Sequence, residues 1–84
     1  DKKAYADIHK NGDMWYIEYI ESKRKGGGTD LINKIAVDAK KQGVKTIQLS
    51  TTEFSGYEFF DKMGFKEIYP DIFDPVDIPM VLYL

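Results

Sequence analysis

The segment of this sequence with the clearest chemical potential is a run of three cations and three glycines, Lys23-Arg24-Lys25-Gly26-Gly27-Gly28, followed by Thr29. Glycine has no Cβ, so the backbone can bend sharply here and come close to a ligand. Helical spacing begins directly afterwards, and the first N–H groups of a helix have no partner within it and lie at its positive end. Cations, N–H groups and close backbone approach together favour the binding of a phosphate or pyrophosphate. The Thr29 hydroxyl either adds to this site or caps the helix.

A purely structural turn explains the run less well than a ligand site does. A turn needs one glycine, whereas each further glycine near a helix start costs up to about 1 kcal/mol relative to alanine, and adjacent cations repel one another. The run is not a P-loop, because no Gly-Lys-Ser/Thr follows it, and it lacks the Gly-x-Gly-x-x-Gly of dinucleotide-binding loops. The sequence therefore favours an anion site of another kind.

The elements before the run predict a β-hairpin over residues 4–22. Residues 14–22 are rich in aromatic and β-branched residues, which is typical of a strand. Asn11-Gly12-Asp13 is a turn cluster of the kind that joins hairpin strands, and it connects residues 14–22 to residues 4–10. The cationic and glycine run therefore follows the second strand of a hairpin.

The elements after the run predict a helix and a parallel strand. Apolar residues recur at helical spacing up to Gly43, which is in the usual place for a left-handed cap, so we expect loop and helix over 23–42. Residues 44–51 alternate apolar and polar side chains, as a strand does. Strand, glycine turn, helix and strand form a βαβ unit, and its two strands should be parallel.

A second, shorter helix is predicted over residues 55–63. Ser55-Gly56-Tyr57-Glu58 has the spacing of a capping box, in which the Ser hydroxyl and the Glu carboxylate each serve a backbone N–H. Phe54 and Phe59 have the spacing of a hydrophobic staple across this helix start. This helix is expected to end at Gly64.

The C-terminal part predicts two further strands, over 65–69 and 79–84, separated by a loop over 70–79 that contains three prolines. The expected fold is therefore one α/β domain with a mixed β-sheet of about five strands and two helices.

Length and composition limit the classes of protein to consider. The 84 residues suffice for one domain, 1–84, with one modest core. They are 43% hydrophobic and 31% charged, which is typical of a soluble globular protein. A formal net charge of −2 makes general affinity for nucleic acid unexpected. There is no cysteine and no apolar stretch long enough for a membrane span or signal peptide, so we expect a cytoplasmic location and no membrane partner.

Three features in this order resemble the GNAT superfamily of acetyl-CoA-dependent N-acetyltransferases: the strand that leads into residues 23–28, the helix and strand that follow, and Phe60-Asp61-Lys62-Met63-Gly64-Phe65. The family has a (Gln/Arg)-x-x-Gly-x-(Gly/Ala) loop that holds the CoA pyrophosphate, and here Lys23 at the first position keeps a cation. A later helix of the family commonly ends Tyr-Glu-Lys-Leu-Gly-Phe. The resemblance covers roughly residues 4–84 and implies acetyl-CoA as co-substrate, with no metal.

The sequence departs from the family in two ways. The family usually has two more strands and one or two helices before the hairpin, and these often wall the acceptor pocket. Either this is a minimal, N-terminally shortened form of the fold, or the first half lies elsewhere on a precursor or on a partner chain, and a start at Asp1 rather than Met fits either case. The second departure is Phe60, which occupies the position of a tyrosine that serves as general acid toward the CoA thiolate.

The resemblance implies aminolysis of a thioester, for which the amine must lose a proton and the carbonyl oxygen must be stabilised. It places a backbone N–H around Tyr19 or Ile20 next to that carbonyl. Candidate bases are Glu18 and Glu21, which a regular strand places on opposite faces unless a bulge intervenes. Either one taken alone is more commonly a solvated carboxylate. Apolar neighbours favour Glu18, because such surroundings raise the proton affinity of a carboxylate.

Other side chains are weaker candidates for proton transfer. Tyr57 lies one helical turn before Phe60 and is the candidate replacement for the missing hydroxyl, although core packing is its commoner role. His9 is the one histidine of the chain, and an isolated imidazole is more often a surface residue than a base. The sequence does not rank three further tyrosines as donors, namely Tyr19, Tyr69 and Tyr83.

An acidic patch in the late loop suggests the acceptor. It comprises Asp71, Asp74 and Asp77, with Glu67 nearby. Charge-rich proline segments are usually solvated loops, but in the GNAT family this loop often borders the acceptor entrance. We therefore expect it to steer a cationic amine, such as a protein lysine or N-terminus or a small cationic amine.

The sequence leaves three functions open. The first is an N-acetyltransferase that moves acetyl from acetyl-CoA directly to a primary amine. The second is a non-catalytic CoA-binding module or inactive paralogue, which Phe60 and the missing first half suggest. The third is a plain phosphate- or nucleic-acid-binding domain that uses Lys23, Arg24 and Lys25, which the net charge disfavours. A second copy or a partner chain is the candidate for completing the acceptor pocket, because the first hairpin strand is left as a sheet edge.

Overall fold

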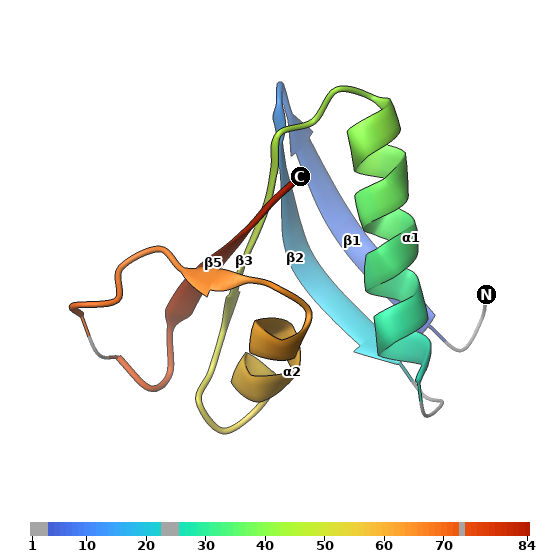
Figure 1. Ribbon diagram of the computed structural model, residues 1–84. Helices are drawn as coiled ribbons and strands as arrows, with labels where there is room; N and C mark the ends of the chain where they lie inside the picture. The colour runs from blue at the N-terminus through green and yellow to red at the C-terminus, as the bar shows by residue number, and fades with distance from the viewer. Residues whose placement is uncertain (1–3, 23–25, 73) are drawn as a thin grey trace.

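The computed structural model describes residues 4–22, 26–72 and 74–84 (Figure 1). It contains five strands and two helices, in chain order β1 (Ala4–Asn11), β2 (Met14–Ser22), α1 (Gly27–Lys41), β3 (Thr46–Thr51), α2 (Tyr57–Lys62), β4 (Lys66–Glu67) and β5 (Ile78–Tyr83). The sheet order is β1-β2-β3-β5-β4. Among these strands of the described residues, β2 and β3 pair in parallel and the other neighbours are antiparallel. The predicted mixed α/β fold and the parallel pair across the glycine loop and helix are confirmed.

The core lies on one face of this sheet, under the helices. Figure 1 shows α1 lying along β1 and β2, while α2 sits near the other end of the sheet. The alternation of β2 sends Trp15 and Ile17 into the core, where they join Ile32 and Ile35 of α1. Phe65, which has no exposed surface, belongs to the same cluster. Each such side chain contributes about 1.5–3 kcal/mol by leaving water, so this one cluster holds the helices on the sheet.

The other face of β1 and β2 is not covered by these helices. Tyr5, Asp7 and His9 alternate with the part-buried Ala6 and Ile8 along β1 and are exposed. The sheet therefore has a helix-covered face and, over β1 and β2, an open face. This distinction decides which side chains can meet at the site described below.

The start of α2 differs from the prediction. Its N-cap is Gly56, with a φ of 104°, and among the described residues no side chain caps the helix. Ser55 instead accepts a hydrogen bond from the Thr51 hydroxyl at its carbonyl oxygen, at 2.7 Å. The prediction of a capping box is therefore wrong, because the N-cap is Gly56, in a left-handed conformation that other residues rarely adopt. Phe54 is 80% exposed, so the hydrophobic staple with Phe59 is wrong as well.

The bounds of the last two strands also differ from those predicted. The strand predicted over 65–69 is reduced to Lys66–Glu67, which pairs with β5. The chain leaves the sheet at Ile68, whose N–H still donates to the Pro79 carbonyl oxygen at 2.9 Å, because Pro70 cannot continue a ladder. The last strand starts at Ile78, so the predicted loop over 70–79 ends earlier than expected. No helix in the described ranges is long and apolar enough to cross a bilayer.

Candidate functional site

A bulge in β2 gives the site its shape. In the β1–β2 ladder Asp7 lies opposite Tyr19, but the next residue, Ile8, lies opposite Ile17, so Glu18 is an extra residue in β2. Such a bulge bends the strand and changes the face on which the following side chains lie. Because Asp7 belongs to the open face, its partner Tyr19 lies there too. The sequence left open whether a bulge interrupts this strand, and the structure contains one.

The bulge brings the two candidate bases to the same face. Tyr5 on the open face is the register partner of Glu21, and Glu18 contacts His9, which also belongs to the open face. Regular alternation would have placed Glu18 and Glu21 on opposite faces.

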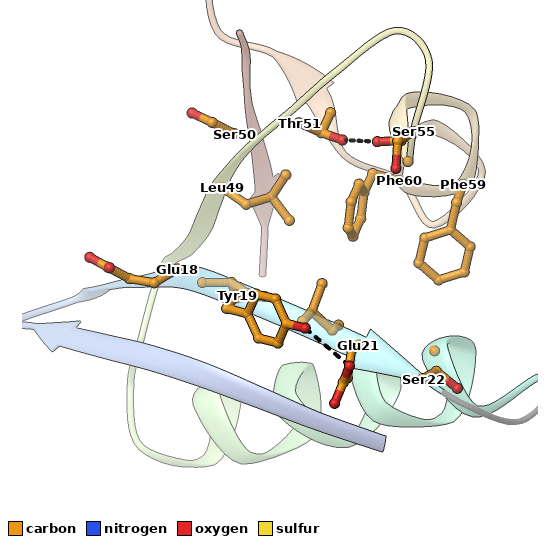
Figure 2. A pocket seen from close by; sticks show the side chains of 14 residues that line it. Glu18, Tyr19, Glu21, Ser22, Leu49, Ser50, Thr51, Ser55, Phe59 and Phe60 are labelled. Atoms are coloured by element: carbon orange, nitrogen blue, oxygen red, sulfur yellow. Dashed lines mark hydrogen bonds between the residues drawn. The ribbon is translucent and has the colours of Figure 1, made fainter. Parts of the chain in front are cut away.

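Beyond the bulge β2 diverges from β3, and a pocket of about 490 Å³ lies where the two strands separate (Figure 2). The parallel ladder covers only Met14–Ile17 on β2. Residues 18–22 of β2 line one side of the pocket and residues 49–51 of β3 line the other. On the edge toward β3, the backbone of residues 18–20 therefore faces the pocket rather than a strand. An extended ligand with amide groups can pair with such an edge as an added strand does.

The helices close the pocket on the covered face of the sheet. Gly28 from the first turn of α1 lines it, as do Phe59 and Phe60 from α2. The pocket thus extends from the N-terminus of α1 to the carboxylates on the open face, through the gap between β2 and β3. The first N–H groups of α1 have no acceptor within the helix, and they lie at its positive end.

The glycine run has structural reasons that the sequence argument missed. Gly26 is the N-cap of α1 with a φ of 82°. A Cβ on Gly27 would overlap the Ser22 hydroxyl, and a Cβ on Gly28 would lie 3.3 Å from Cζ of Phe59. The turn itself requires only Gly26, and close packing is a further reason for Gly27 and Gly28 beside the ligand site. Lys23, Arg24 and Lys25 lie outside the described residues.

The polar side chains of the open face form two pairs. Nε2 of His9 lies 3.5 Å from Oε1 of Glu18, and both side chains are more than half exposed. The Tyr19 hydroxyl donates a hydrogen bond of 3.0 Å to Oε2 of Glu21 (Figure 2). This hydrogen bond, with the charge of Glu21, raises the pKa of Tyr19 above its usual value of 10.0. Tyr19 is therefore protonated at neutral pH and can donate.

Sequence reasoning missed the contact of His9 with Glu18. A signal for it was present, because counting back from the turn at Gly12 pairs His9 with Tyr16. Glu18 is then a diagonal neighbour on the same face, within reach of a long side chain.

Other sequence candidates lie away from the pocket. Tyr57 does not line it, and its hydroxyl donates to Oε2 of Glu67 at 3.0 Å, which raises the pKa of Tyr57. The structure therefore places the Tyr57 hydroxyl on Glu67 and outside the pocket lining. Tyr69 and Tyr83 are exposed and do not line the pocket either.

The acidic residues of the late loop are also outside the pocket lining. Asp71, Asp74 and Asp77 lie in the loop before β5. The Glu53 N–H donates to the Pro75 carbonyl oxygen at 2.8 Å, which joins this loop to the segment after β3. Glu67 is the acceptor of the Tyr57 hydroxyl. Within the described ranges, no three His, Asp or Glu side chains are arranged to hold a metal ion.

Comparison with known proteins gives the same fold. No protein-family model matches the chain, and no curated protein sequence matches it. Solved structures do match over nearly the whole chain. The PaiA N-acetyltransferase from Thermoplasma acidophilum, in complex with coenzyme A, is 20% identical with a TM-score of 0.83, over 96% of this chain and 53% of that one.

Two further acetyltransferase structures agree. A GNAT-family acetyltransferase from Staphylococcus aureus Mu50 is 17% identical with a TM-score of 0.80, over 98% of this chain and 60% of that one. The ribosomal-protein-S18-alanine N-acetyltransferase from Escherichia coli is 23% identical with a TM-score of 0.78, over 96% of this chain and 61% of that one. The chain has the fold of these acetyltransferases and spans about half to three fifths of their length.

Proposed function

We propose that this chain binds acetyl-CoA and transfers its acetyl group to a primary amine, as an N-acetyltransferase of GNAT type. The observation that carries the proposal is the pocket between β2 and β3, which joins the N-terminus of α1 to two carboxylates on the opposite face of the sheet. The fold of known acetyltransferases, one of them in complex with coenzyme A, supports it.

In this proposal acetyl-CoA extends along the pocket. The pyrophosphate belongs at the start of α1, where Gly26, Gly27, Gly28 and Thr29 follow the cations of residues 23–25. The amides of the pantetheine arm can pair with the open edge of β2. This orientation brings the thioester to the backbone around Tyr19 and Ile20, whose N–H groups are the candidates for stabilising the carbonyl oxygen.

The reaction can then be written with a role for each group. Glu18 takes a proton from the ammonium form of the acceptor. The freed amine attacks the thioester carbonyl, the C–N bond forms, and the C–S bond breaks to release the thiolate of CoA. The nitrogen loses its second proton as it becomes the amide, and this proton replaces the one that the donor gives to the thiolate. Phe60 lines the pocket but has no proton to donate. Tyr19 is the pocket-lining tyrosine, and we assign it as the donor to the thiolate.

Replacing Tyr19 with phenylalanine is expected to lower kcat for CoA thiol release by about tenfold. The effect is at the low end for a general acid, because an alkyl thiol with a pKa near 8.5 leaves readily without help. Tyr57→Phe is the matched control and should leave kcat unchanged, since the Tyr57 hydroxyl is bound to Glu67 outside the pocket. A larger loss in Tyr57→Phe than in Tyr19→Phe would contradict the assignment.

The acceptor is a cationic amine in this proposal, and a protein lysine or N-terminus fits as well as a small molecule. Converting Asp71, Asp74 and Asp77 together to asparagine is expected to raise KM for such an amine about three- to tenfold at low salt, because the loop loses its attraction for cations. The same change should flatten the dependence of KM on ionic strength. Initial rates at 20 mM and about 300 mM salt test this, and an unchanged KM would refute steering by the loop.

The proposal is tested by two measurements on the same protein. Isothermal titration calorimetry with acetyl-CoA should show binding, and a thiol-trapping assay across a panel of amines and peptides should show release of free CoA with some of them. Binding without thiol release across the panel would favour a non-catalytic CoA-binding module, which Phe60 also suggests. Absence of binding would refute both functions.

A further inference from the structure

We propose that His9 is the proton outlet of Glu18: it accepts from the Glu18 carboxyl the proton that the acceptor amine gives up, and it passes this proton to solvent. The inference rests on the proposed function of the pocket. It starts from one contact across the hairpin, in which Nε2 of His9 lies 3.5 Å from Oε1 of Glu18.

The position of Glu18 links the pocket to this imidazole. Glu18 lines the pocket, whereas His9 does not. Glu18 is the extra residue of the β2 bulge, and His9 lies on β1 opposite Tyr16, two residues before Glu18. The His9 side chain is 72% exposed, so it reaches bulk water directly. A proton can therefore leave the pocket through Glu18 and His9 without passing the bound co-substrate.

The groups around His9 leave this route open. Asp7 lies two residues before it on the same face of β1, with Tyr19 opposite Asp7. Tyr16, opposite His9, donates its hydroxyl hydrogen to Oγ of Ser50 at 3.3 Å. Lys10, the neighbouring cation, is directed to the helix-covered side, with Nζ 4.5 Å from the centroid of the buried Trp15 ring.

The proton balance of the route is closed. The ammonium of the acceptor gives one proton to the Glu18 carboxylate, and the neutral amine attacks the thioester. The second proton that the nitrogen loses as it becomes the amide goes to the CoA thiolate by way of Tyr19, so one proton remains for this route. The Glu18 carboxyl then gives this proton to the neutral His9 imidazole and becomes a carboxylate again. The imidazolium releases the proton to water or buffer. Imidazole is suited to this step because it has two ring nitrogens, so it can accept a proton at one and release a proton from the other.

The contact can be tested without any turnover. His9 is the only histidine of the chain, so its imidazole signals are unambiguous in NMR spectra. At a fixed neutral pH, Glu18→Gln should shift the imidazole ¹⁵N and ¹Hε1 signals of His9, while Lys10→Gln should leave them in place. Unchanged signals in Glu18→Gln would overturn the proposal.

The role in proton transfer is tested by activity. His9→Gln is expected to lower kcat for thiol release about tenfold, with the affinity for acetyl-CoA unchanged, because only the proton step is slowed. In His9→Ala, free imidazole added to the buffer should restore kcat in proportion to its concentration, which a merely structural role of His9 would not produce. Lys10→Gln is the matched control on the same strand and should retain full activity.

Failure of this inference is distinguishable from failure of the proposed function. If the unsubstituted chain binds acetyl-CoA and releases thiol, but His9→Gln does so at the same kcat, only the proton outlet is refuted. Loss of activity in His9→Ala that imidazole does not restore refutes it as well. If the unsubstituted chain releases no thiol with any acceptor, the acetyltransferase function is refuted, and the outlet with it.

Discussion

Replacing Glu18 with glutamine is expected to lower kcat for CoA thiol release by about 10²–10³-fold, because an amide cannot take the proton of the acceptor amine. Glutamine keeps the length and shape of the side chain. The Glu18 side chain is 52% exposed, so the substitution should not disturb the core. Acetyl-CoA affinity, measured by calorimetry, is expected to stay within about twofold, since the lost interaction is used in the chemical step and not in binding.

Glu21→Gln is the matched control for this prediction. Glu21 lies on the same open face three residues later and also lines the pocket, so the change in charge is the same. Its Oε2 already accepts the Tyr19 hydroxyl hydrogen, and a glutamine carbonyl oxygen can accept that bond too. We expect a loss in kcat below about fivefold. The reverse order of losses would identify Glu21 as the base, and small losses in both variants would contradict a carboxylate base at this site.

The fold was predictable from the sequence because local patterns agree with its topology. The hairpin over 4–22 follows from two strand-like segments around Asn11-Gly12-Asp13. The parallel pairing of β2 with β3 follows from the helix between them. The start of α2 was less predictable, since the spacing of Ser55 and Glu58 fits a capping box, while the cap is a glycine with a positive φ.

The site was only partly predictable, because it depends on one irregularity in the ladder. Glu18 and Glu21 are visible in the sequence, but strict alternation separates them. The bulge at Glu18 brings them to one face, and it also starts the divergence of β2 from β3. A bulge inserts one residue without an obligatory sequence signature, apart from glycine in some types. The position of the bulge is therefore known only from the register of the whole hairpin.

The glycine run shows a second limit of sequence reasoning. Three glycines favoured a ligand site because a turn was thought to need one of them. In the structure Ser22, a few residues earlier in the chain, and Phe59, which is distant in sequence, supply a separate packing reason for Gly27 and Gly28. Packing and ligand binding are therefore both explanations of Gly28, and an experiment must separate them.

Replacing Gly28 with leucine separates these two explanations, and it is expected to weaken acetyl-CoA binding by about 100-fold or more. Gly28 lines the pocket at the N-terminus of α1, where the pyrophosphate is proposed to bind. A leucine side chain there would occupy the pocket and keep the ligand from the first N–H groups of the helix. Calorimetry with acetyl-CoA measures the loss.

Asn33→Leu is the matched control for the Gly28 substitution, because it adds the same side chain to an exposed position of α1 outside the pocket. It should bind acetyl-CoA as the unsubstituted chain does. Thermal unfolding distinguishes the two roles of Gly28. A helical glycine is about 1 kcal/mol worse than alanine, so leucine gains helix propensity, which offsets part of the strain against Phe59. If Gly28→Leu lost its folded structure, packing would be the main role of this glycine. If it stayed folded and bound acetyl-CoA with unchanged affinity, the pyrophosphate would not lie at the start of α1. Loss of binding with a melting temperature within about 5 °C of the unsubstituted chain is the result that assigns Gly28 to the ligand.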